Sequence, residues 1–192
     1  GQLEAETYAQ GLGNVYTFGP TFRAENSNTS RHLAEFWMIE PEMCFIDFTQ
    51  LQDVAELYLK YVIDYCLKNN LEDIEFLNKQ YQETLLTDLN NMVSKPFQRM
   101  TYTEVIDFLL KEIENGRVII RDNTIENKKF KKRAKGKHIF EEAVYWGCDL
   151  GSEHEKYMTD KEIERPLIIT DYPKYIKSFY MKSTDDCLEE ME

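Results

Sequence analysis

Charged and aromatic residues alternate along two segments near the start of the chain, residues 15–25 and 36–45. Successive side chains of a β-strand point to opposite faces of the sheet, so residues two apart share a face. If the apolar faces of both segments look into one core, the other faces form a solvent-accessible floor. That floor collects Arg23, Glu25, Phe36, Glu40 and Glu42. A guanidinium that binds phosphate and a ring that stacks on a base are what a nucleotide site requires.

The two segments are predicted to be the strands of an antiparallel hairpin spanning about residues 15–45. The link Asn26–Ser30 is rich in residues that hydrogen-bond to their own backbone and tolerate turns. Such a loop can close over a ligand. The alternative is an ordinary hairpin whose exposed face merely carries charges.

The run Phe22-Arg23-Ala24-Glu25, followed by His32 and Phe36, resembles motif 2 of the class II aminoacyl-tRNA synthetases. The flanking sequence is similar to the asparaginyl branch of this family more than to the aspartyl branch, which carries a lysine where this chain has Ala5. Further segments that resemble the family are Tyr145–Leu150, Glu153–Tyr157, Ile169–Lys174 and Phe179–Met181.

The resemblance implies a reaction in two steps. Asparagine and ATP give asparaginyl-adenylate and pyrophosphate, and the aminoacyl group then passes to tRNA(Asn), with no side-chain nucleophile. Arg23 is the catalytic residue that the resemblance indicates, because a fixed donor aimed at the α-phosphate lowers the barrier as charge develops there. Its planar fork holds two phosphate oxygens and keeps its charge.

The remaining site residues also follow from the resemblance. Phe36 would stack beneath adenine, His32 would reach the outer phosphates, and Glu25 would order the loop. Gln2 and Glu40 would receive the ammonium group of asparagine, while Glu6 would accept from its side-chain amide and repel aspartate. Taken without the resemblance, Gln2 and Glu6 read as ordinary surface residues. The full ATP-binding set is Arg23, Glu25, Arg31, His32 and Phe36.

The fold class is predicted to be α+β, an antiparallel sheet flanked by helices. The resemblance implies that residues 1–192 are a partial class II catalytic domain, with the motif 1 and motif 3 regions absent. Mg²⁺ ligands are therefore expected beyond Glu192 and none within the chain. We expect this chain alone to have negligible aminoacylation activity, and the full-length enzyme to be a cytoplasmic homodimer.

Periodicity predicts the elements that support the hairpin. A helix runs from an N-cap at Thr49 to Asn69, and a second amphipathic helix covers Leu71–Leu89. A strand over residues 96–102 leads to Thr103, which caps a helix through Lys111. Near the end, residues 166–171 and 178–182 are predicted strands that extend the sheet.

Composition narrows the class of protein. Hydrophobic residues make up 42% of the 192 residues, which argues against disorder. No apolar run approaches the ~20 residues of a membrane helix, and the polar start has no signal-peptide pattern, so we expect a soluble, cytosolic protein. The four cysteines lie far apart without metal-ligand spacing, which predicts reduced structural thiols.

The net charge of −12 is unusual for a protein that binds RNA. The exception is an insertion at about residues 123–138, where seven positive charges fall within the ten residues 128–137. This segment can contact tRNA phosphates, but charge runs are more often solvated, mobile insertions, and that is the interpretation we favour from sequence. In either case we expect it to be poorly ordered without RNA.

Other functions remain open at this point. An aspartyl-specific synthetase and an asparagine synthetase of related fold are the nearest alternatives, and Ala5 and Glu6 are the residues that discriminate among them. A noncatalytic synthetase-like protein that binds a partner is a further alternative, against which the intact Arg23, Glu25 and Phe36 count.

Overall fold

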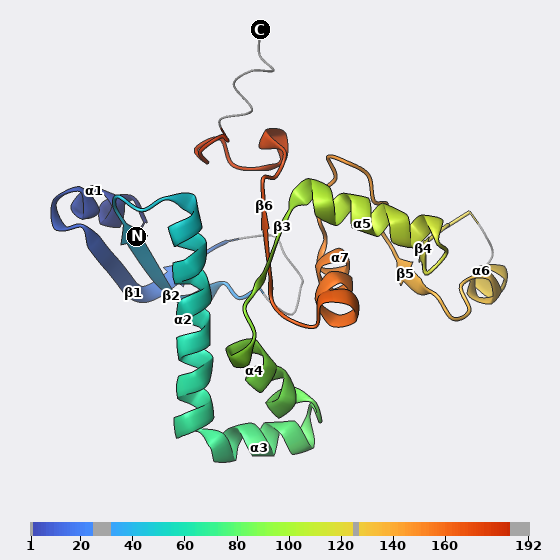
Figure 1. Ribbon diagram of the computed structural model, residues 1–192, viewed down its shortest axis with the longest axis horizontal. Helices are drawn as coiled ribbons and strands as arrows, with labels where there is room; N and C mark the ends of the chain where they lie inside the picture. The colour runs from blue at the N-terminus through green and yellow to red at the C-terminus, as the bar shows by residue number, and fades with distance from the viewer. Residues whose placement is uncertain (1, 25–31, 125–126, 185–192) are drawn as a thin grey trace, which may run out of the picture. The chain divides into compact units, whose positions relative to one another are not determined.

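The structure is a computed structural model that describes residues 2–24, 32–124 and 127–184. The chain divides into two compact units, residues 1–55 and residues 56–192. We call them the N-terminal unit and the C-terminal unit and describe each by itself (Figure 1).

The N-terminal unit is a helix packed on a β-hairpin. Helix α1 (Gln2–Leu12) is followed by Gly13, whose φ of +83° suits glycine. The Gly13 N–H donates to the Ala9 carbonyl at 2.8 Å and closes the last turn of the helix. Strands β1 (Asn14–Phe22) and β2 (Glu35–Met43) pair antiparallel, with Phe18 opposite Ile39. The predicted hairpin is therefore confirmed.

The exposure of the two hairpin faces is the reverse of the prediction. The face with Phe36, Glu40 and Glu42 is half-buried, and α1 packs on the hairpin with Ala5 and Ala9 buried. The apolar face is exposed, including Phe18 and Trp37, whose rings lie 5.2 Å apart. The alternation of the strands was predicted correctly, but the choice of covered face depends on where α1 packs.

Helix α2 (Phe48–Asn69) begins one residue before the predicted N-cap Thr49, and that prediction was wrong. The cap is Asp47. Its carboxylate accepts from the Gln50 N–H at 2.7 Å, and its own N–H donates to the Gln50 side chain at 2.8 Å. This reciprocal pair satisfies two backbone donors at the start of the helix.

The predicted helix Leu71–Leu89 is two helices, α3 (Leu71–Gln80) and α4 (Leu85–Ser94). The chain turns between them, and the Asn78 side chain accepts from the Leu86 N–H at 2.9 Å across that turn. No glycine or proline marks the break. The sequence pattern therefore gave no local signal for it.

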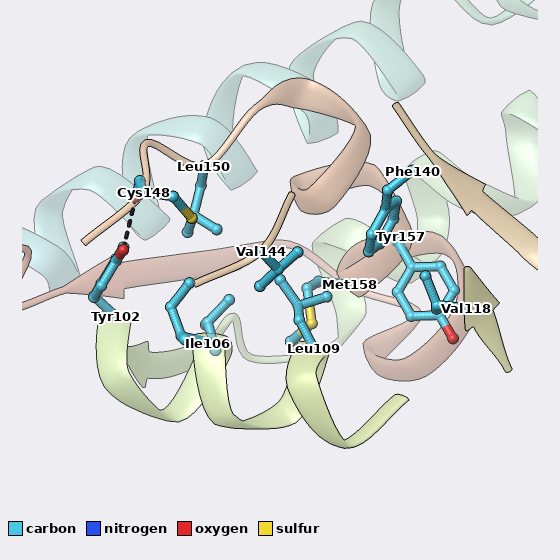
Figure 2. Close-up of a cluster of buried hydrophobic side chains, with 11 residues drawn as sticks. Tyr102, Ile106, Leu109, Val118, Phe140, Val144, Cys148, Leu150, Tyr157 and Met158 are labelled. Atoms are coloured by element: carbon cyan, nitrogen blue, oxygen red, sulfur yellow. Dashed lines mark hydrogen bonds between the residues drawn. The ribbon is translucent and has the colours of Figure 1, made fainter. Parts of the chain in front are cut away.

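Helix α5 (Tyr102–Glu114) organises the core of the C-terminal unit. Its N-cap is Thr101, which forms a capping box with Glu104, so the prediction of Thr103 was wrong by two residues. The buried stripe of α5 packs against residues from later segments of the chain (Figure 2). The stripe consists of Tyr102, Val105, Ile106 and Leu109, which lie on one helical face.

Two short parallel strand pairs flank this core. Strand β3 (Gln98–Thr101) pairs with β6 (Leu167–Thr170), and β4 (Val118–Ile120) pairs with β5 (His138–Phe140). The strands at 96–102 and 166–171 are thus confirmed, but they form their own parallel sheet. Residues 178–182 contain a turn at 179–180 and do not form the predicted strand. Parallel partners lie far apart in sequence, joined by long crossovers, so strand patterns alone do not reveal them.

Short helices complete the C-terminal unit. They are α6 (Asn127–Arg133), α7 (Ser152–Tyr157), the π-helix η1 (Met158–Ile163) and the 3₁₀-helix η2 (Lys174–Ile176). In the part of the chain that the structure describes, no helix has the length and apolar character needed to cross a bilayer. Cys44, Cys66 and Cys148 are free thiols, as predicted for them, and Cys187 lies outside the described residues.

Candidate nucleotide and amino acid site

Arg23 and Phe36 lie on the same face of the hairpin. The backbone N–H of Arg23 donates to the Ala34 carbonyl at 3.0 Å, which continues the β1–β2 pairing one step past the end of β1. The Arg23 guanidinium carbon lies 5.6 Å from the centroid of the Phe36 ring. This is within the range of a cation–π contact. The prediction that the Arg23 guanidinium and the Phe36 ring lie on the same side of the hairpin is therefore confirmed.

Glu40 lies on the same face, nearer the middle of the hairpin. Its carboxylate accepts from the Thr17 hydroxyl at 2.9 Å, across the directly paired positions of β1 and β2. This bond fixes one carboxylate oxygen and leaves the other for a further donor. The sequence did not indicate a role for Thr17, although its pairing opposite Glu40 follows from the hairpin register.

Gln2 and Glu6 lie one turn apart on α1. The Gln2 amide donates to the Glu6 carboxylate at 2.8 Å, and both side chains are exposed. Helix α1, which holds both residues, is 11 residues long and was not predicted from the sequence. The helix brings these two residues to the hairpin because its buried Ala5 and Ala9 pack inward.

Glu42 adds a third carboxylate to this part of the N-terminal unit. Burial raises the pKa of Glu42, and the negative charges of Glu6 and Glu40 raise it further. Three carboxylates that repel one another favour a bound cation, because a positive charge among them relieves that repulsion. We had placed Glu42 on this face from sequence but had assigned it no role.

The remaining predicted ATP-binding residues fall between β1 and β2 in the sequence. Glu25 and Arg31 are outside the described residues. His32 is exposed at the start of the returning segment. Arg99 lies on β3, with its guanidinium 3.9 Å from the Glu56 carboxylate.

The arrangement in the N-terminal unit suits a molecule with an anionic part, a flat ring and an ammonium group. The guanidinium offers charge-assisted hydrogen bonds to phosphate oxygens, and Phe36 offers an apolar ring face. Among the described residues, no group of three or more histidine, cysteine or carboxylate side chains is arranged to hold a metal ion.

Segments of the C-terminal unit that the sequence singled out are held by polar contacts to its core. The buried Tyr102 hydroxyl donates to the Cys148 carbonyl at 2.7 Å (Figure 2). It also accepts from the Gly147 N–H at 2.9 Å. The Glu153 carboxylate accepts the backbone N–H groups of Glu141 and Glu142, each at 2.9 Å. These bonds fix the loop between β5 and α7. Tyr102 positions the backbone of Gly147 and Cys148, a role that the sequence did not indicate.

A buried carboxylate supports the same region. Glu112 is 1% exposed and accepts two hydrogen bonds from the Arg117 guanidinium and one from the Tyr157 hydroxyl at 2.9 Å. The hydrogen bonds from Arg117 hold the pKa of Glu112 below its ordinary value, opposing the effect of burial. The pair anchors α7 and the strand β4 to α5.

Comparison with known proteins assigns the chain to a family. The family model described as tRNA synthetases class II (D, K and N) matches residues 3–191. Among curated relatives, the asparagine–tRNA ligase of Acetivibrio thermocellus is 49% identical over 97% of this chain and 35% of its own length. That of Clostridium tetani is 48% identical over the same shares. The chain thus spans about a third of the length of these relatives.

Solved structures give the same grouping. The chain is similar to Pyrococcus horikoshii asparaginyl-tRNA synthetase complexed with asparaginyl-adenylate, with a TM-score of 0.73 and 32% identity over 96% of this chain and 35% of that one. It is also similar to an Entamoeba histolytica aspartyl-tRNA synthetase, with a TM-score of 0.65 and 25% identity over 96% of this chain and 32% of that one. Identity is higher to the asparaginyl structure than to the aspartyl one.

Proposed function

The chain belongs to the class II tRNA synthetases of the D, K and N type, and from this membership we propose that the full-length protein is an asparagine–tRNA ligase. The names of its curated relatives support asparagine as the amino acid. The substrates are then asparagine, ATP and tRNA(Asn). As expected for the family, we also propose a cytoplasmic homodimer.

The observation that carries the proposal is the Arg23–Phe36 pair on one face of the hairpin. In the first step, a carboxylate oxygen of asparagine attacks the α-phosphorus of ATP and pyrophosphate leaves. The Arg23 guanidinium binds two oxygens at the α-phosphate and stabilises the charge that develops there. Phe36 stacks against adenine and fixes the nucleotide for attack. Glu25, Arg31 and His32 complete the nucleotide contacts.

The carboxylates of α1 and β2 bind the amino acid. Glu40, fixed by Thr17, and Gln2 receive the ammonium group, and Glu6 accepts from the side-chain amide. An aspartate side chain would bring a negative charge towards Glu6. Position 5 is a small, buried alanine and not the lysine of the aspartyl branch, so it adds no positive charge to offset that repulsion.

Mg²⁺ would accompany the ATP phosphates and neutralise part of their charge. The steps above use only groups of this chain.

Asparagine-dependent pyrophosphate exchange by the full-length protein tests the mechanism. We expect Arg23→Ala to lower kcat about 100- to 1,000-fold, the usual cost of one donor to a transition-state oxyanion. Arg23→Lys should recover only part of this loss, because lysine lacks the planar fork. Arg99→Ala is the matched control and should leave exchange unchanged, since Arg99 pairs with Glu56. Full exchange by Arg23→Ala would refute the assignment.

Aspartate is the competing substrate, because the chain also resembles an aspartyl-tRNA synthetase structure. The two are separated by running the same assay with each amino acid. We expect kcat/KM for asparagine to exceed that for aspartate by at least about 100-fold, because the asparagine amide donates a hydrogen bond to Glu6 whereas the aspartate carboxylate meets a like charge there. Equal use of both amino acids would contradict the role of Glu6.

A further inference from the structure

A strongly positive surface lies on α6 and the turn that follows it. Residues 128–137 carry seven cationic side chains and no acidic one, and Lys128, Lys131, Lys132, Lys135 and Lys137 are exposed. We call these five lysines the basic surface. Removing seven positive charges from a total of −12 leaves the rest of the chain with −19, so this surface stands out against an acidic background.

The basic surface is attached to a packed scaffold. Phe130 of α6 is 1% exposed, and Ala134 directly after the helix is also buried. The Arg121 guanidinium lies 4.7 Å from the centre of the Phe130 ring, and the Lys137 N–H donates to the Ala134 carbonyl at 3.0 Å. The segment is therefore a helix anchored on one side, which differs from the solvated insertion that the sequence favoured.

The lysines of the basic surface are available to a partner. In the described ranges 32–124 and 127–184, none of the five forms an ion pair. Intramolecular carboxylates thus do not neutralise them. Several unpaired cations held close together by one anchored helix attract a polyanion strongly at low ionic strength.

We propose that the basic surface binds the sugar–phosphate backbone of RNA, which under the proposed function is the tRNA substrate. Lysine ammonium groups contact phosphates as point charges and do not read base edges, so the contribution is to affinity and not to sequence choice. A membrane surface is a poorer partner. The apolar side chains of α6 and its end, Phe130 and Ala134, are buried in the protein and cannot enter a bilayer.

The test is tRNA binding by the full-length protein and by its Lys128→Gln/Lys132→Gln/Lys135→Gln variant, from 50 to 500 mM salt. We expect the variant to raise the Kd at least tenfold at 50 mM salt. The slope of log K against log salt should flatten by about 2–3, since each phosphate contact contributes about 0.7–0.9. The matched control, Lys68→Gln/Lys79→Gln/Lys95→Gln, changes the net charge equally and should leave both quantities unchanged.

The outcomes separate this proposal from the proposed function. Pyrophosphate exchange without tRNA should be the same in the triple variant and the unaltered protein, which shows that both are folded and active. If the triple variant remains active in exchange and keeps its tRNA affinity and salt slope, the RNA-binding role of the basic surface is refuted. The ligase assignment would stay intact. Equal losses in the two triple variants, or a loss confined to binding of phosphatidylserine vesicles, would overturn it as well. Absence of exchange in the unaltered protein would instead refute the proposed function.

Discussion

The Tyr102 hydroxyl is the group whose removal tests the C-terminal core most directly. Tyr102 is 0% exposed, and its hydroxyl bonds both the Gly147 N–H and the Cys148 carbonyl. Tyr102→Phe keeps the ring and deletes both bonds. Because a buried backbone group left unsatisfied costs about 1–3 kcal/mol, we expect the segment around Gly147 to lose that much local stability.

Hydrogen–deuterium exchange of the full-length protein measures this loss. A free-energy change of about 1–3 kcal/mol corresponds to exchange that is about 5- to 150-fold faster at the Gly147 amide. Tyr61→Phe is the matched control, because Tyr61 is 69% exposed and its substitution should leave the Gly147 amide unaffected. Unchanged protection of Gly147 in Tyr102→Phe would refute the role of the hydroxyl.

The same residue predicts behaviour at alkaline pH. Burial raises the pKa of Tyr102 from 10.0 to about 12. The stability that comes from keeping the phenol protonated is therefore complete below pH 10 and is lost as the pH rises through 12. Two pKa units correspond to roughly 3 kcal/mol of unfolding free energy. In urea unfolding, the difference in free energy of unfolding between the unaltered protein and Tyr102→Phe should narrow above pH 10. A difference that stays constant with pH would contradict this reasoning.

Two further substitutions test other contacts. Arg117→Ala leaves Glu112 buried without its main partner and should lower the free energy of unfolding by about 3 kcal/mol at pH 7 in urea unfolding. Because Arg117 lowers the pKa of Glu112, the deficit should shrink as the pH falls below the ordinary value of 4.5; a deficit independent of pH would argue against the pair. Gly147→Ala forces a φ of +98° on alanine and directs its Cβ into the Tyr175 hydroxyl. Thermal unfolding should therefore show a free energy of unfolding lower by about 1–2 kcal/mol. Unaltered stability would mean that the turn relaxes freely.

Local patterns predicted much of what positions the candidate site. The alternation of the hairpin placed Arg23 and Phe36 on one face, because side-chain direction in a strand follows from position alone. The Asn69 end of α2 and the strands at β3 and β6 also followed from periodicity and from turn residues. These features are fixed by contacts between residues close in sequence.

Helix boundaries were predicted less well, since several residues compete for each cap. Thr49 and Thr103 are good capping residues by type, but Asp47 and Thr101 have partners three positions later, Gln50 and Glu104, which complete reciprocal bonds. The capping box was therefore visible in the sequence at both sites. The prediction considered only the type of the capping residue and not its partner three positions later, and it was therefore wrong at both helices.

The sequence by itself determined which side chains share a face of the hairpin, because the strand repeat of two needs no distant partner. Only the tertiary structure decided that α1 covers the face with Glu40 and Glu42, and that Phe130 anchors the basic surface. It also decided that Glu112 is buried against Arg117 and Tyr157. Each of these depends on burial between segments far apart along the chain, and burial is a property of the packed fold that no local pattern encodes.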